Sequence, residues 1–252
     1  MLGGASAGDE VAIITDGLLY HFIAPDSGST VANAGSVSGN WNCEGTKIAG
    51  PTSVGGGLQL ATTDLNQLQF PGVPSPGDVG TICFWYKPNT AGDASALTVG
   101  AHPGTSYAGY YVEVTPTGKL ILAIGKGSGG TNVTTRHNVD FENASVWDIT
   151  KVTTSPYDWV HITATFDQVQ SGGLFTSMKP NGAYFDGVAG IKGAESGGIS
   201  TMGFSGTDDR IGPGSWVASS TVAPTGRSFA DIRVYGRQLS SAEISSIAAG
   251  TG

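Results

Sequence analysis

Two carboxylates at alternate positions come nearest, in this sequence, to the spacing of a catalytic pair. In Asp140-Phe141-Glu142 the acids are two residues apart, so both would point to the same side of a strand. Such a pair can serve glycoside hydrolysis as acid and base, or as acid and nucleophile. The surrounding sequence is polar and rich in glycine, so we interpret the pair as a solvated strand face or a loop.

Four aromatic residues are candidates for binding sugars: Trp41, Trp147, Tyr157 and Trp216 lie in polar, turn-rich segments. Exposed rings flanked by Asn, Asp or Arg commonly stack against sugars. The alternative for each ring is that it caps the core from a loop. The region 125–157 is also long and polar, and loops of that length are usually functional.

Several other kinds of chemistry find no support in the sequence. The four histidines are too scattered for a zinc site, and His161 beside Trp159 is typical of a half-exposed strand residue. The glycine-rich run 125–130 lacks the strand-to-helix context of a phosphate loop. The net charge of −8, with only 12 Lys and Arg, argues against nucleic acid as a partner.

The N-terminus and the two cysteines bear on where the protein works. Residues 1–15 lack a basic region and an apolar run of signal-peptide length, and no stretch approaches a membrane span. We therefore expect a chain that is not exported and has no membrane partner. Cys43 and Cys83 can form one disulfide, but Cys83 lies in an apolar run, where a buried free thiol is the simpler interpretation.

The elements that must position these residues are predicted to be short strands in one all-β domain. Glycine accounts for 40 of 252 residues and charged residues for only 13%, and turn residues recur at intervals typical of short strands. Tyr110–Val114 and Lys119–Ile124 are predicted to form a hairpin. Asp186-Gly187 favours a type I′ turn in a second one. We expect residues 1–15 to be an extension or arm and residues 16–252 to be one sandwich.

Only the C-terminus has the pattern of a helix. Ser240 and Glu243 are spaced as a capping box, in which each side chain bonds the other's backbone N–H. Leu239 can staple onto Ile244, and Ile247 continues the apolar stripe. The sequence therefore predicts one short helix docked on the sandwich.

Three stretches of the sequence carry a family resemblance. They are Asp16–Phe22 with the Gly/Asn-rich loop after it, the central segments 81–88, 158–167 and 183–187, and the closing segment Phe229–Ile244. Together they resemble laminin G-like domains of the concanavalin A-like superfamily, most specifically in the closing segment. The resemblance spans residues 16–250 and implies a jelly-roll sandwich of two antiparallel sheets. That fold hosts lectins, glycan-binding modules, glycosidases and structural proteins.

The resemblance also implies a catalytic signature and a calcium site, and this sequence departs from both. Glycosidases of the superfamily carry a third acid that Asp140-Phe141-Glu142 lacks. The family's calcium site takes an acid from the Gly/Asn-rich loop and one from the closing strand. This sequence has Asn33 and Ala230 at those positions. We therefore expect no cofactor, with calcium as the alternative.

Two acids remain as calcium candidates, Asp26 and Asp231. Strand alternation predicts that Ala230, Ile232 and Val234 share one face and that Asp231 lies on the other, so Asp231 does not simply replace the missing acid. The alternative interpretations are that Asp26 forms a turn and that Asp231 is a surface charge.

Three functions stay open on the sequence. The first is a non-enzymatic component of a virus particle: a bacteriophage capsid decoration or tail-associated protein that contacts host-surface glycans and binds other virion proteins or copies of itself. The second is a secreted or cell-surface carbohydrate-binding module, and the third is a glycoside hydrolase. The missing export signal and the sparsely charged, Gly/Ser/Thr-rich composition favour the first, which places the protein in the virion.

Overall fold

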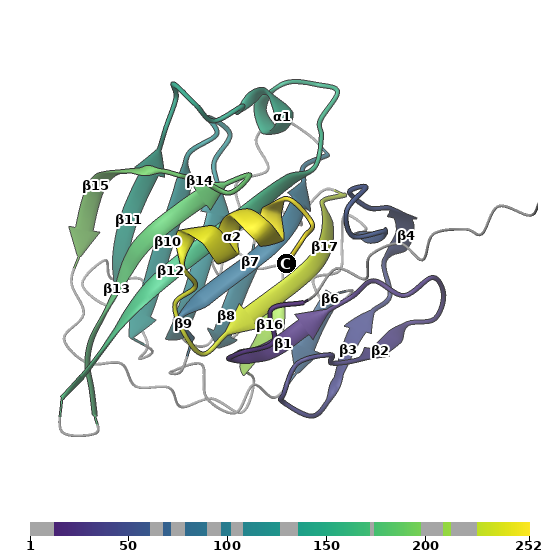
Figure 1. Ribbon diagram of the computed structural model, residues 1–252, viewed down its shortest axis with the longest axis horizontal. Helices are drawn as coiled ribbons and strands as arrows, with labels where there is room; N and C mark the ends of the chain where they lie inside the picture. The colour runs from purple at the N-terminus through teal and green to yellow at the C-terminus, as the bar shows by residue number, and fades with distance from the viewer. Residues whose placement is uncertain are drawn as a thin grey trace, which may run out of the picture.

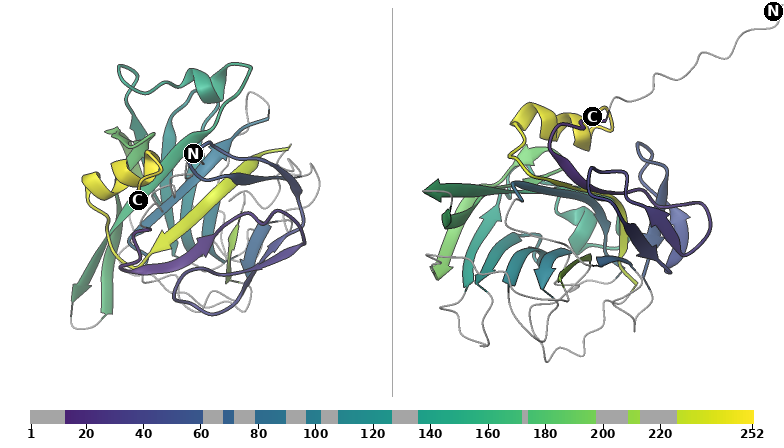
Figure 2. Two further views of the ribbon diagram at one scale, coloured as in Figure 1. Left: turned by 45° about the vertical axis from the view of Figure 1, so that its right-hand side comes forward. Right: turned by 90° about the horizontal axis from the view of Figure 1, so that it is seen from below.

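A computed structural model of the chain describes residues 13–60, 68–71, 79–89, 97–101, 108–126, 136–171, 174–197, 209–212 and 226–252. Within these ranges the chain forms two antiparallel sheets that face each other as a sandwich (Figures 1 and 2). The predicted all-β sandwich is confirmed. Residues 1–12 of the predicted arm lie outside the described residues.

One sheet has eight strands, in the order β14-β13-β12-β7-β17-β5-β4, with β1 paired to β17. Its strands are β1 (Leu18–Phe22), β4 (Thr46–Ala49), β5 (Gly56–Gln59), β7 (Thr81–Lys87), β12 (Val160–Ser171), β13 (Leu174–Phe185), β14 (Val188–Ala189) and β17 (Ser228–Tyr235).

The other sheet has nine strands, in the order β15-β11-β10-β9-β8-β16-β6-β3-β2. Its strands are β2 (Thr30–Ala32), β3 (Asn40–Cys43), β6 (Leu68–Pro71), β8 (Leu97–Ala101), β9 (Ala108–Val114), β10 (Leu120–Lys126), β11 (Arg136–Glu142), β15 (Ile191–Gly197) and β16 (Asp209–Gly212).

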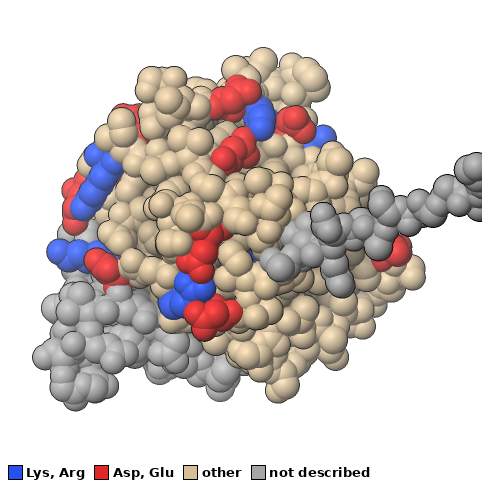
Figure 3. Space-filling view, in the orientation of Figure 1, with Lys and Arg blue, Asp and Glu red and all other residues tan. Residues whose placement is uncertain are grey.

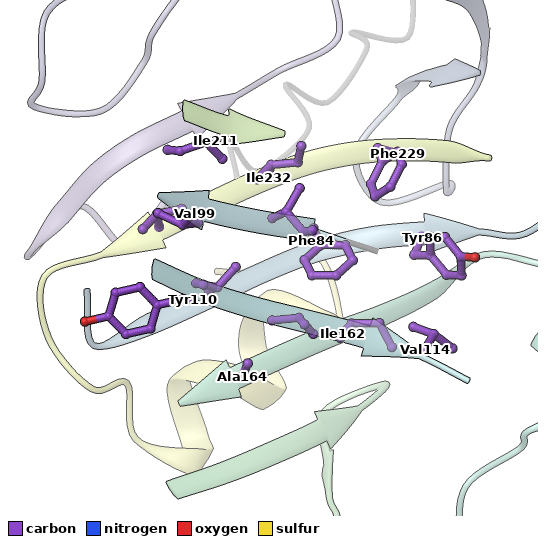
Figure 4. Close-up of a cluster of buried hydrophobic side chains, with 14 of the residues drawn as sticks. Phe84, Tyr86, Val99, Tyr110, Val114, Ile162, Ala164, Ile211, Phe229 and Ile232 are labelled. Carbon is purple, nitrogen blue, oxygen red and sulfur yellow. The ribbon is translucent and has the colours of Figure 1, made fainter. Parts of the chain in front are cut away.

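The core fills the space between the sheets because alternate residues of both point inward. Figure 4 shows Phe84, Ile162 and Ile232 of the eight-stranded sheet together with Tyr110 of the other. The ring of Tyr110 meets that of Phe166 edge-on, with centroids 4.7 Å apart. Each fully buried apolar side chain of this size contributes about 1.5–3 kcal/mol, so this layer holds the two sheets together.

Both predicted hairpins are confirmed. β9 and β10 pair from Leu120 opposite Val114 onward, and Gly118 takes the positive φ of 77° that their turn needs. In the second hairpin Asp186 and Gly187 have φ of 49° and 78°. Positive φ at both positions is what a type I′ turn requires.

The predicted C-terminal helix is α2 (Ser241–Ala248), and its capping box is confirmed. The Ser240 hydroxyl accepts from the Glu243 N–H at 3.3 Å, and the Glu243 carboxylate accepts from the Ser240 N–H at 2.8 Å. Ile244 and Ile247 are buried with Leu239 against the eight-stranded sheet. Figure 2 shows α2 on the outer side of that sheet.

A second, one-turn helix was not expected from the sequence. It is α1 (Thr150–Thr153), which lacks a side-chain cap at its start and is held by the buried Val152. Its presence corrects the expectation that only the C-terminus is helical. Neither described helix has the length and hydropathy needed to cross a membrane.

Both cysteines are buried free thiols, as the simpler interpretation held. Cys43 lies in the core between the sheets, and Cys83 lies under α2 with Tyr235. Burial raises the pKa of Cys83 to about 12, so this thiol is unreactive at neutral pH.

A bulge in β17 contradicts the predicted alternation. The register against β7 shifts between Ala230 and Arg233, and Asp231 has a φ of 46°. Ile232 and Val234 lie in the core between the sheets, whereas Ala230 lies with Trp85 in a separate cluster. The prediction that Ala230 shares their face is wrong, because the bulge inserts one residue and resets the alternation.

Candidate functional site

The outer face of the nine-stranded sheet carries a row of residues that cross-strand pairing brings into line. Tyr111 of β9 pairs with Thr98 on one side and Ala123 on the other, and Ala123 pairs with Asn138 of β11. The strand neighbours Tyr110, Val112, Leu122, Ile124 and Val139 lie in the core between the sheets. Alternation therefore turns Tyr111 and Asn138 outward. In Figure 2 this face lies opposite α2.

A parallel row carries two carboxylates. Glu113 of β9 and Asp140 of β11 both pair with Ile121 of β10, so they flank it on the same face. Further along the sheet, the amide residues Asn42 and Gln69 pair with each other and are also half-buried. The face thus carries amides and carboxylates, which can bind hydroxyls, together with the largely buried phenol of Tyr111.

Tyr111 is the anchor of this face. Only 5% of the residue is exposed, and its hydroxyl is hydrogen-bonded to the Glu113 side chain. Burial, and next the negative charge of Glu113, raise the pKa of Tyr111 well above its usual value. The phenol therefore stays protonated and fixes the position of Glu113 as a hydrogen-bond donor.

Asn138 supplies an unused acceptor. Its side-chain oxygen is buried and accepts no hydrogen bond within the part of the chain that the structure describes. A buried acceptor without a donor is costly, by about 1–3 kcal/mol. A ligand hydroxyl that displaces the atoms covering this oxygen would satisfy it.

The candidate catalytic pair lies on this same strand, β11. Asp140 is half-buried, but Glu142 is exposed, with 50% of its side chain open to solvent, and it forms an ion pair with Lys119 at 2.9 Å. A general acid in glycoside hydrolysis is a desolvated carboxyl, and Glu142 is not one. The geometry agrees with the interpretation as a solvated strand face.

A second polar group lies on the outer side of the eight-stranded sheet, where β1 pairs with β17. The Asp231 carboxylate accepts from Arg233 Nε at 2.8 Å and lies 2.7 Å from His21 Nε2. Arg233 also donates to the main-chain oxygen of Gly252 at 2.7 Å. These residues line a cavity of about 180 Å³ whose wall includes the exposed Ile13 and Ile23, which would face any small ligand.

Burial and the nearby bonded groups act in opposite directions on the charges of this cluster. Burial opposes ionisation of Asp231, but the bond to His21 and the charge of Arg233 outweigh it and lower the carboxyl pKa. Nearby, burial lowers the pKa of His161 to about 4, with a smaller opposing effect of Asp231. Asp231 is 6% exposed, so the interpretation of this residue as a surface charge is wrong.

The residues at the family's calcium position do not fit a calcium ion. The Asn33 amide group donates to Leu19 O at 3.0 Å and to Val37 O at 2.7 Å, while its oxygen accepts from the His21 N–H at 2.6 Å. The oxygen also accepts from Trp41 Nε1 at 3.2 Å. All four hydrogen-bonding positions are therefore used inside the protein.

The other calcium candidates add no ligand set. Asp26 is exposed in the loop before β2, and Asp231 is held by His21 and Arg233. Among the described residues no three His, Cys, Asp or Glu side chains gather as a metal site would require. Within the described ranges, Asp26 and Asp231 therefore form no coordination shell for calcium.

Two of the four predicted sugar-stacking rings lie in the interior. Trp41 is fully buried between Phe22 and Phe70, and Trp147 stacks on Phe185 and donates to Val188 O at 2.9 Å. For both tryptophans the interpretation as exposed stacking rings is wrong and the alternative, that the ring packs on the core, holds. Aromatic area in a turn-rich segment is buried when core space lies beneath it.

For Tyr157 and Trp216, sugar stacking stays a prediction. Tyr157 is half-buried in the segment between α1 and β12, so its ring stays a candidate. Trp216 lies outside the described residues.

Sequence reasoning missed the two rows on the nine-stranded sheet. Tyr111 and Glu113 belong to a hairpin that was predicted, and alternation alone marks them as sharing a face. What the sequence could not supply is the pairing of β10 with β11, because residues 127–135 separate the two strands. That pairing brings Asn138 and Asp140 beside Tyr111 and Glu113.

Comparisons with known proteins agree on the fold. The binding domain of botulinum neurotoxin DC, solved in complex with SialylT, matches with a TM-score of 0.61 and 12% identity, covering 95% of this chain and 53% of that one. The same domain solved with rat synaptotagmin II matches with a TM-score of 0.61 and 11% identity, over 95% and 53%. The binding domain of botulinum neurotoxin serotype C1 gives 0.59 and 12%, over 95% and 53%.

The chain spans about half the length of these structures, and at such low identity the likeness concerns the fold alone. No curated protein matches the sequence. Residues 61–245, however, match the family described as the concanavalin A-like lectin/glucanases superfamily. The chain belongs to this superfamily, as a laminin G-like β-sandwich.

Proposed function

We propose that the protein is a non-enzymatic, lectin-like binding module that takes glycans on the outer face of its nine-stranded sheet. The unused acceptor of Asn138 is the observation that carries the proposal. It lies in line with Tyr111 and beside the row of Glu113 and Asp140. Such a set of amide, carboxylate and phenol groups matches the hydroxyls of a sugar.

The membership in the superfamily and the similar structures support binding over catalysis. The superfamily includes both lectins and glucanases, so the choice between binding and catalysis rests on the residues of the site. Here the alternating carboxylates of β11 are divided between a half-buried residue and a solvated ion pair. The similar structures are described as binding domains, one of them solved with SialylT and one with a protein, synaptotagmin II.

A glycan array probed with the full chain tests this proposal. We expect binding to a limited set of glycans and no release of reducing sugar from those that bind. No binding to any of a diverse set of polysaccharides would overturn the glycan proposal. Hydrolysis of a bound glycan would show that the protein is a glycoside hydrolase.

As the setting of this module we propose the surface of a virus particle, as a capsid decoration or tail-associated protein of a bacteriophage. The sparsely charged, Gly/Ser/Thr-rich composition supports this location. Co-sedimentation of the chain with capsids or tails lacking it tests the proposal. A chain that binds glycans but no virion component would instead be a secreted or cell-surface carbohydrate-binding module.

A further inference from the structure

Both sheets end at the same side of the sandwich. β14 is the last strand of the eight-stranded sheet and β15 the last of the nine-stranded one, and Gly190 alone separates them in the chain. Every residue of β15 from Ile191 to Ser196 is exposed. An exposed edge strand presents unpaired backbone groups to which another strand can pair.

Exposed apolar side chains gather at this side. Among the described residues five large apolar side chains are exposed, and three belong here: Val146 at 57%, Val188 at 42% and Ile191 at 63%. The buried Trp147 lies beside Val188, since its indole donates to Val188 O at 2.9 Å. We call these three exposed side chains the edge patch, and contiguous patches of this kind mark interaction sites.

A bulge gives β15 an unusual arrangement of charge. Lys192 pairs with Phe141 and Glu195 with Val139. These two pairs are three positions apart along β15 but only two positions apart along β11. In a regular strand residues three apart point to opposite faces, but the extra residue puts Lys192 and Glu195 on the same face. Their side chains indeed meet, with Nζ 2.5 Å from Oε2.

This arrangement is complementary to itself. In an antiparallel pair of identical strands, Lys192 of one copy can lie opposite Glu195 of the other, and the reverse pair forms at the same time. A two-fold axis perpendicular to the sheet keeps each residue on its own face, so directly opposite residues must share a face. The bulge meets that condition for Lys192 and Glu195, and also for Ile191 and Ser196.

We propose that β15 pairs antiparallel with β15 of a second copy of this chain, with Lys192 of each copy opposite Glu195 of the other. The two nine-stranded sheets then form one continuous sheet, and the edge patch is covered at the junction. Each copy has a single β15, and a two-fold pairing of this strand with itself occupies the β15 edge of both copies, so the pairing closes as a dimer. The outer faces of both copies point the same way, which would present two binding sites side by side.

The charge pattern argues for a second copy over a strongly charged partner. Three bases around the edge each form an ion pair with an acid: Lys192 with Glu195, Lys119 with Glu142, and Lys151 with Asp186. On the face shown in Figure 3, acidic and basic residues lie side by side along the edge where Figure 1 places β15. A surface with balanced charge fits its own copy and gives nucleic acid or a polyanion nothing to bind.

Sedimentation equilibrium of the full chain tests this directly. The wild-type chain of 25.6 kDa is expected to sediment as a dimer. Lys192→Glu places glutamates opposite each other at both pairs and should weaken the dimer by about tenfold or more. Glu195→Lys should do the same with lysines. Lys119→Glu, which breaks a similar exposed ion pair one strand further in, is the matched control and should leave the dimer intact.

Mixing the two weakened variants provides the decisive result. A Lys192→Glu chain and a Glu195→Lys chain have opposite charges at every cross-pair, so together they should form a mixed dimer although neither forms one alone. The double variant Lys192→Glu/Glu195→Lys should dimerise like wild type. A monomeric wild-type chain, or a dimer that none of these substitutions changes, overturns the proposal, and unchanged circular dichroism excludes misfolding as the cause.

Discussion

Asn33 holds the loop after β1 in place through its own hydrogen bonds. Its amide donates two hydrogen bonds and accepts two, and these bonds tie the loop after β1 to β1 itself and to Trp41. A carboxylate at this position could accept but not donate. Asn at this position therefore holds the loop with donated hydrogen bonds that Asp could not make.

Replacing Asn33 by Asp should destabilise the protein. The Asn33→Asp variant loses two donated hydrogen bonds and turns a negative charge toward the oxygens of Leu19 and Val37, at a cost of about 2 kcal/mol or more. Urea unfolding measures the loss, and Asn40→Asp, at an exposed position of β3, is the control. Calcium should stabilise neither chain; stabilisation of wild type by calcium would show that a calcium site exists after all.

His161 should make the stability depend on pH. In the folded protein burial lowers its pKa from 6.5 to about 4, so between these values the unfolded chain binds more protons than the folded one. Stability therefore falls as the pH drops through this window, by about 2 kcal/mol between pH 6.5 and 5.

His161→Leu removes this titration and keeps the contact with Trp85 apolar. Urea unfolding at pH 6.5 and pH 5 should show the variant losing about 2 kcal/mol less than wild type over that interval. Any packing effect of leucine is common to both pH values and cancels. Equal losses for the two chains would place the pH dependence elsewhere.

At the scale of elements, local chemistry was predictable and long-range pairing was not. The Asp186-Gly187 turn and the Ser240–Glu243 capping box depend on residues within four positions of each other, so their patterns are complete in the sequence. The bulge at Asp231 depends on His21, which is 210 positions away and bonds the same carboxylate as Arg233. No residue close to Asp231 in the sequence predicts that contact.

The same reason explains the incorrect exposure of Trp41 and Trp147. Each lies in a polar stretch of sequence, but each covers core space formed by distant elements, Phe22 and Phe70 for one and Phe185 for the other. Polarity of neighbours along the chain describes the loop and not the surface beneath the ring. Buried and exposed aromatic candidates could therefore be told apart only once the fold was known.

The capping box of α2 should contribute measurably to stability. Ser240→Ala removes the acceptor for the Glu243 N–H and should cost about 1 kcal/mol. Thermal unfolding measures the loss, and Ser241→Ala, one residue further on and exposed, should change little. If both variants lose the same amount, the effect is one of serine removal and not of capping.

At the scale of the whole molecule, the two sheets have different roles. The outer side of the eight-stranded sheet is closed by α2 and by the buried cluster of His21, Asp231 and Arg233. The outer face of the nine-stranded sheet keeps half-buried polar residues and the unused acceptor of Asn138. The family and the sandwich fold could be predicted from the closing segment. The different roles of the two sheets could not, because they depend on the order of the strands.

The central claim is that glycans bind on the outer face of the nine-stranded sheet. Isothermal titration of an array-selected glycan into wild type and into Asn138→Ala tests it most directly, with Asn181→Ala, an exposed asparagine on β13 of the other sheet, as the matched control. Loss of one hydrogen bond should weaken binding by about tenfold in Asn138→Ala and leave Asn181→Ala unchanged. Equal affinity in all three chains would contradict the claim and place the binding site elsewhere on the molecule.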